Sequence, residues 1–151
     1  MPSDAEVIST LNGLIETCRD GAEGFRAAAE GVRGAGLREL FHTYARQRAE
    51  FAGVLQDEVR RLGGDPAREG SVVASLHRGW MGLRAALEGD DDRAVLSECE
   101  RGEEVALESY RAALDADMPA GVRALVERQF AEVKEARHRI GDLARGSGAG
   151  A

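Results

Sequence analysis

Two pairs of side chains in this sequence have the types and spacing of metal ligands: Glu39 with His42, and Glu135 with His138. Residues three apart lie on the same side of a helix, so each pair could offer a carboxylate and an imidazole to one ion. These groups suit iron or manganese. Bundles that hold two such ions use a Glu-x-x-His from each of two helices and a Glu from each of the other two. The spacing therefore raises a metal centre as a hypothesis, and the direction of the side chains tests it.

The helical periodicity turns both pairs away from the core. Glu39 and His42 each lie about 150° from the centre of the apolar stripe of residues 37–62, at 100° per residue. Glu135 and His138 lie about 140–160° from the centre of the stripe of the last helix. The two stripes are Leu37, Leu40, Phe41, Tyr44, Phe51, Leu55, Val59 and Leu62, and Val122, Val126, Phe130, Val133, Ile140 and Ala144. We interpret both pairs as solvated residues on charge-rich helices.

Other polar residues fall on the inward faces. Glu103 lies close to the centre of a stripe formed by Leu96, Cys99, Ala106, Leu107, Tyr110 and Leu114. Arg48 lies within about 30° of its stripe centre and Arg137 within about 40° of its own. A weak internal repeat, which relates residues 23–28 to 108–113, places Cys18 opposite Glu103.

A buried carboxylate must be paired or protonated, because an isolated buried charge is very costly. Arginine suits a two-bonded, desolvated pair with a carboxylate. We therefore predict a buried Glu103–Arg48 ion pair, with Arg137 and the hydroxyl of Tyr44 or Tyr110 as further members. In the alternative interpretation these are boundary residues whose charged ends reach water.

Five helical segments must position these residues. Ser3 and Glu6 form a capping box, Gly63 to Pro66 stop the second segment, Gly89 caps the third, and Asp117 caps the fifth, with Pro119 in its first turn. The expected segments are 4–32, 37–62, 71–87, 90–114 and 117–145, followed by a flexible Gly-rich tail at 146–151. The domain therefore covers residues 1–145. The third segment is long enough, at roughly 25 Å, to cross the bundle, which makes the second and fourth segments parallel.

The amino-acid composition and the net charge argue against several classes of protein. The chain has 151 residues, 43% apolar and 31% charged, with few aromatic residues and a net charge of −7. That charge opposes nucleic-acid binding. No basic leader and no membrane-spanning apolar stretch are recognised, so we expect a cytoplasmic protein. Cys18 and Cys99 are expected to be reduced core thiols, with a disulfide as the alternative.

Several stretches of the chain resemble a known group. They are Leu11-Asn12-Gly13-Leu14-Ile15-Glu16, Leu62-Gly63-Gly64-Asp65-Pro66, Leu76-His77-Arg78-Gly79-Trp80 and Glu100-Arg101-Gly102-Glu103. Together they resemble the ferritin-like superfamily and, within it, an uncharacterised bacterial family, domain of unknown function 2383. The resemblance implies an all-α, ferritin-like four-helix bundle with an extra helix in the crossover, and no established activity. Aligned with the ferritin ligand turn, the second segment places Arg48 and Phe51 at the ligand positions.

These observations favour a non-catalytic bundle with a structural, stress-related or partner-binding role and a degenerate di-iron site. No cofactor, nucleic acid or membrane is expected as a partner, and a homo-oligomer is possible. The alternative is an oxidoreductase or iron-handling protein with iron or manganese at a divergent site formed by Glu103, Glu135 and His138, or by Glu100. A Cys–His nucleophile is not expected, because neither cysteine has an inward histidine beside it. His77 and Trp80 are interpreted as packing residues of the crossover.

Overall fold

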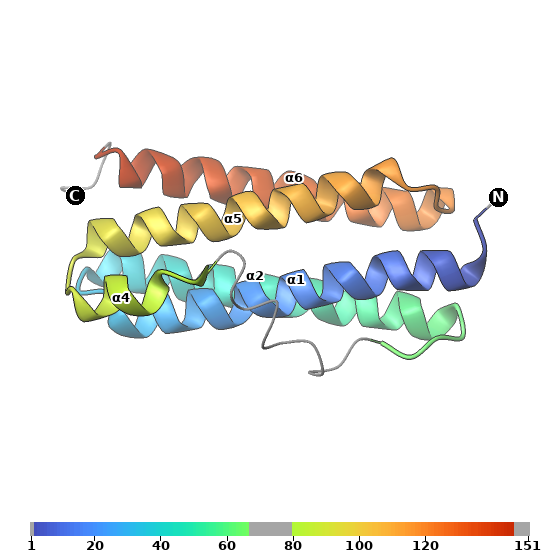
Figure 1. Cartoon of the computed structure of the whole chain (residues 1–151), viewed down its shortest axis with the longest axis horizontal. Helices are drawn as coiled ribbons and strands as arrows, with labels where there is room; N and C mark the ends of the chain where they lie inside the picture. Colours follow the sequence, from blue (N-terminus) through green and yellow to red (C-terminus); the bar gives the residue numbers. More distant parts are fainter. Residues whose placement is uncertain (1, 67–79, 147–151) are drawn as a thin grey trace.

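The computed structural model describes residues 2–66 and 80–146. Within these ranges it contains helices α1 (Asp4–Gly31), α2 (Ala35–Arg61), α4 (Leu83–Glu88), α5 (Asp92–Asp115) and α6 (Ala120–Ala144). The four long helices form a bundle in which α1 pairs with α2 and α5 pairs with α6 (Figure 1). The two pairs meet mainly between α1 and α5, whereas α2 and α6 touch little. The predicted all-α four-helix bundle is therefore confirmed.

The crossover has the predicted direction. Helices α2 and α5 run the same way along the bundle, and α4 lies at the end where α5 begins (Figure 1). The helix expected at 71–87 lies largely outside the described residues. In the described part, α4 occupies the last turns of that range, and Gly89 is its C-cap as predicted. No helix among the described residues is long and apolar enough to cross a membrane.

The helix boundaries follow local capping chemistry. Ser3 and Glu6 form the predicted capping box at α1, and the side chain of Asp91 caps α5 by accepting from the amide of Arg93. The prediction that Asp117 caps the last helix is wrong: Pro119 is the N-cap of α6. Proline has no amide hydrogen that would need an acceptor at that position, and its fixed φ is compatible with the backbone at the start of a helix. Helix α2 begins at Ala35, two residues before the predicted start, and also has no side-chain cap.

The apolar core is divided into two clusters along the bundle axis. One cluster includes Val7 to Cys18 of α1 with Phe51 to Val59 of α2, and the other includes Phe25 to Val32 with Phe41 and Tyr44. On α5 the clusters meet between Cys99 and Ala106, and on α6 between Val133 and Ala136. The positions between the clusters are where polar side chains enter the interior.

Candidate functional site: a buried ion pair at the bundle centre

Arg48 of α2 and Glu103 of α5 form a two-bonded ion pair between the two apolar clusters. Nη1 and Nη2 of Arg48 donate to Oε1 and Oε2 of Glu103, each at 2.5 Å. Arg48 is 1% exposed and Glu103 is fully buried. The structure thus brings together the two residues that the helical periodicity turns inward.

Helix α1 completes the surroundings of the guanidinium. A Cβ atom at Gly21 would lie 3.4 Å from Cγ of Arg48 and 3.5 Å from its Nη1, so this glycine lets the side chain lie close against the α1 backbone. The ring centroid of Phe25 lies 5.4 Å from Cζ of Arg48, within the range of a cation–π contact. The remaining Nε of Arg48 donates to Oε1 of Gln47 at 3.1 Å. Each of the three guanidinium nitrogens therefore donates a hydrogen bond, and the ring of Phe25 lies against the group.

The electrostatics of the pair favour the charged form of the arginine. Burial alone opposes the charge on Arg48, but the attraction and hydrogen bonds of Glu103 outweigh it, and the pKa of Arg48 is raised above its ordinary value. A buried pair of this kind gains enough to offset desolvation only when its geometry is good and its remaining donors are satisfied. At this centre the pair is two-bonded, and Gln47 binds the third nitrogen of the guanidinium.

A second chain of hydrogen bonds lies beside the ion pair. The hydroxyl of Tyr110 donates to Oε1 of Gln129 at 2.6 Å, and Nε2 of Gln129 is 3.4 Å from the carbonyl oxygen of Phe51. Because that hydroxyl hydrogen is used, the thiol of Cys18 is the donor in its 3.1 Å contact with Tyr110. Burial raises the pKa of Cys18 to about 11, so the thiol stays protonated. Burial also raises the pKa of Tyr110 well above its ordinary value.

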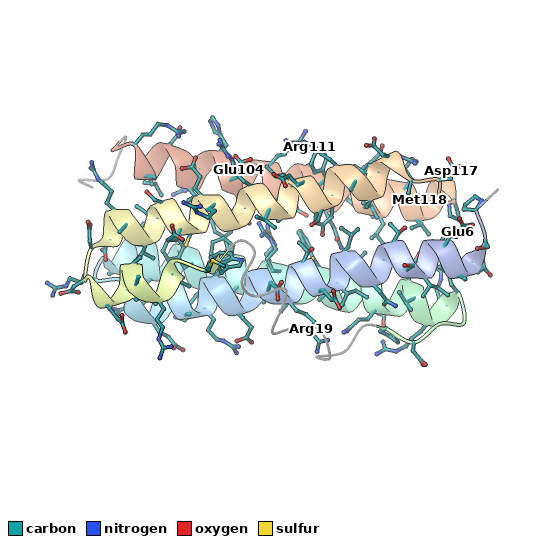
Figure 2. The ribbon with its side chains drawn as sticks, in the orientation of Figure 1. Glu6, Arg19, Glu104, Arg111, Asp117 and Met118 are labelled. Carbon is teal, nitrogen blue, oxygen red and sulfur yellow. The ribbon has the colours of Figure 1, made fainter. Side chains whose placement is uncertain are left out.

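None of the three further members predicted for the ion pair, Arg137, Tyr44 and Tyr110, bonds to it among the described contacts. Arg137 is half-buried and pairs with Glu104 and Glu100 at the α5–α6 surface, so its assignment to the centre is wrong; Glu104 lies on the side of α5 away from the α1–α2 pair (Figure 2). Among the contacts described, the Tyr110 hydroxyl bonds to Cys18 and Gln129 and not to the ion pair. Tyr44 is buried in the apolar cluster around Phe25, its ring centroid 5.3 Å from that of Phe25.

Gln129 is the functional residue that the sequence analysis missed. The buried positions of α6 include Val122, Val126, Gln129, Val133, Ala136 and Ile140. Counting the half-buried Phe130 as core moved the predicted stripe toward Arg137 and away from Gln129. A polar residue in register with valines at i−3 and i+4 is the signal that could have identified it.

The Glu-x-x-His pairs take the positions predicted by periodicity. Glu39, Glu135 and His138 are exposed and His42 is half-buried. His138 lies 3.4 Å from Asp142 on its own helix. Within residues 2–66 and 80–146, no three His, Cys, Asp or Glu side chains gather where they could share a metal ion. Both cysteines are buried and unpaired, as predicted.

The donor chemistry at the centre does not fit a pair of metals. Di-metal bundles need several inward carboxylates and imidazoles, whereas both oxygens of Glu103 are already bound to a guanidinium. The side chain of Phe51, at a ligand position of the ferritin-like alignment, has no donor atom and is buried. The centre therefore does not provide the ligand set of a di-metal site.

Comparison with known proteins confirms the predicted ferritin-like fold. A mutant of Dps1 from Mycobacterium smegmatis has a similar solved structure, with a TM-score of 0.82 and 16% sequence identity over 94% of this chain and 97% of that one. No curated protein matches the sequence at a significant level. The profile of the family described as "Domain of unknown function (DUF2383)" matches residues 6–116. The chain, a ferritin-like bundle, therefore belongs to the DUF2383 family.

Proposed function

We propose that this protein is a non-catalytic ferritin-like bundle in which the Arg48–Glu103 ion pair takes the place of a metal centre. The observation that carries the proposal is that both Glu103 oxygens are bound by a single guanidinium in a fully buried position. A carboxylate in this state has no free oxygen for a metal ion or for a proton-transfer step.

The surroundings support the same proposal. Cys18 and Tyr110 are the other reactive groups nearby, and burial raises the pKa of both, which keeps them in their protonated, unreactive forms. Catalytic groups generally have pKa values shifted toward the working pH. Here burial shifts both pKa values upward, away from neutral pH, as expected for groups in a structural core.

The alternative metal site receives no support from the geometry. Glu103 is fully buried at the centre, whereas Glu135 and His138 are exposed on the outer side of α6. Glu100, the further candidate ligand, lies near the guanidiniums of Arg137 and Arg145 instead. These side chains point in different directions and cannot bind one ion without a rearrangement of the helices.

In this proposal the protein acts through its surface, as a structural, stress-related or partner-binding element of the cytoplasm. Long amphipathic helices make self-association a reasonable part of the same proposal. A homo-oligomer would then be the working form, with no bound iron or manganese.

Elemental analysis tests the proposal. The protein is purified without chelators from cells grown with added iron and manganese, beside a variant that carries Glu135→Ala and His138→Ala. We expect far less than one ion per chain in both samples. About two ions per chain in the unaltered protein would contradict the proposal, and their loss in the double variant would assign them to the surface pair.

A further inference from the structure

A cavity of about 400 Å³ lies where α2, α5 and α6 meet at one end of the bundle. We call it the α2–α6 pocket. It lies along the seam at which α2 and α6 touch little. The residues that define its chemistry are Leu37, Leu40, Leu96, Leu143, Arg93 and Arg139. Its volume falls within the range of small-molecule sites in proteins, about 300–1,000 Å³.

The leucines give the pocket an apolar wall built from three helices. Leu37 and Leu40 come from α2, Leu96 from α5 and Leu143 from α6. Leu96 belongs to the adjacent apolar cluster, and the other three pack against it while remaining half-buried. A ligand with a short hydrocarbon chain would cover this partly exposed apolar surface.

The charged groups around the pocket are unbalanced toward the positive. In the part of the chain that the structure describes, Arg93 and Arg139 are not paired with a carboxylate, although Arg33 nearby pairs with Asp90. Asp92, the acidic residue of the lining, is already bound to the backbone amides of Arg33 and Gly34, each at 2.9 Å. Among the described residues, the pocket therefore presents two exposed guanidiniums without a carboxylate partner, against the single negative charge of Asp92.

The N-terminus of α2 also lines the pocket, beside the Asp92 carboxylate that accepts from the amide of its N-cap. Gly34, the N-cap of α2, supplies no side-chain acceptor, and Ala35 and Gly36 of the first turn line the pocket. Amide groups at the start of a helix favour an anion. This contribution supports the two arginines, which remain the main recognition groups.

From this arrangement we infer that the α2–α6 pocket binds a small amphipathic carboxylate, an anion with a short aliphatic chain. The hydrocarbon chain packs against the four leucines, and the carboxylate accepts hydrogen bonds from the guanidinium of Arg139, Arg93 or both. The apolar wall disfavours a purely hydrophilic anion such as inorganic phosphate. This binding site goes beyond the proposed function and does not depend on the ion pair at the bundle centre.

Titration of the full chain with octanoate tests the inference, with calorimetry for affinity and amide chemical shifts for location. We expect saturable binding that shifts the amides of Gly34 and Gly36. Octanol, which lacks the charge, and acetate, which lacks the chain, should each bind at least about tenfold more weakly, as expected for losing a charge-assisted hydrogen bond or several buried methylenes.

Variants locate the interaction. Arg139→Gln should weaken octanoate binding about tenfold. Arg128→Gln, which removes an exposed arginine elsewhere on α6, is the matched control and should bind as the unaltered protein does. Absence of octanoate binding, equal binding of octanol, or equal weakening by Arg128→Gln would each overturn the inference.

Discussion

The side chains of Arg48 and Glu103 show what it takes to keep two charges inside a helical bundle. Burial removes both from water, which costs several kcal/mol for each ion. Two hydrogen bonds to Glu103 offset much of this cost, and the guanidinium also donates to the amide oxygen of Gln47 and contacts the ring of Phe25. Each partner therefore makes the burial of the other tolerable, and neither is stable in that position alone.

Glu103→Ala should lower the free energy of unfolding by about 3–5 kcal/mol, because it leaves the Arg48 guanidinium buried without a counter-charge. Urea unfolding followed by circular dichroism measures the change. The paired variant Arg48→Met with Glu103→Leu is the control. It replaces both charges by apolar groups and should recover most of the loss. A Glu103→Ala protein as stable as the unaltered one would show that the pair contributes nothing to the fold.

The thiol of Cys18 should make the protein less stable at alkaline pH. Burial raises its pKa in the folded protein from 9.0 to about 11. Between these values the folded state keeps a proton that the unfolded state has lost, so stability is complete below about pH 9 and falls as the pH rises toward 11. Urea unfolding at pH 8 and pH 10.5 measures the loss.

Cys18→Ser is the control for this pH dependence. Serine can keep a hydrogen bond to Tyr110 but does not titrate in this range. The variant should lose less stability between the two pH values than the unaltered protein. Cys99 and Tyr110 also have pKa values raised by burial, so part of the decline should remain. Equal losses in both proteins would exclude Cys18 as a source.

The polar centre was only partly predictable from the sequence. Arg48 and Glu103 each fall near the middle of a clear apolar stripe, so periodicity identified both. Arg137 also lies near the apolar stripe of its helix, but its side chain pairs with Glu104 and Glu100 on the surface of α5 and not with Glu103. Gln129 was not predicted to be buried, because the type of a single polar residue does not show whether it lies on the buried or the exposed face of a helix. Which edge residue turns inward depends on the neighbouring helix, and one sequence alone does not contain that information.

At the scale of elements, two glycines determine how the crossover joins the bundle. The ring of Trp80 packs against Gly24 of α1 and Gly102 of α5, where a Cβ atom would lie 2.4 Å from the indole in each case. The indole also makes an edge contact with Phe25, with ring centroids 5.1 Å apart. The glycines therefore create the space that holds the end of the crossover against both helical pairs.

Gly24→Ala should destabilise the protein by about 1–3 kcal/mol, because the added methyl group displaces the indole. Gly13→Ala on the same helix is the matched control: its Cβ meets no atom within 4 Å, so the gain in helix propensity should stabilise by up to about 1 kcal/mol. Thermal unfolding measures both. The emission of Trp80, the single tryptophan, should shift to the red in Gly24→Ala alone. Similar melting temperatures for the two variants would contradict this account of the contact.

The helices themselves were largely predictable, because their signals are local. One capping box, glycine stops and apolar periodicity placed the long helices with errors of a few residues at their ends. The start of α6 was misplaced because Asp117 is a good capping residue by type, yet Pro119 takes the N-cap position. The crossover was less predictable, since Trp80 is positioned by glycines that lie far away in the sequence.

At the scale of the whole molecule, the fold is shared with a solved structure of low sequence identity. The similarity to the Dps1 structure is high in shape, at a TM-score of 0.82, and low in sequence, at 16% identity. A bundle of this kind needs only matching apolar stripes and helix lengths, so side chains at its centre can be exchanged without altering the architecture. In this chain the two apolar clusters enclose one polar layer, and an ion pair occupies it.

The identity of that polar layer can be read from crystals grown with iron and manganese salts, with anomalous diffraction measured at the absorption edge of each metal. We predict no anomalous peak between the helices and the guanidinium of Arg48 joined to both oxygens of Glu103. Anomalous peaks at the bundle centre, with Glu103 turned from Arg48 toward bound ions, would contradict the account.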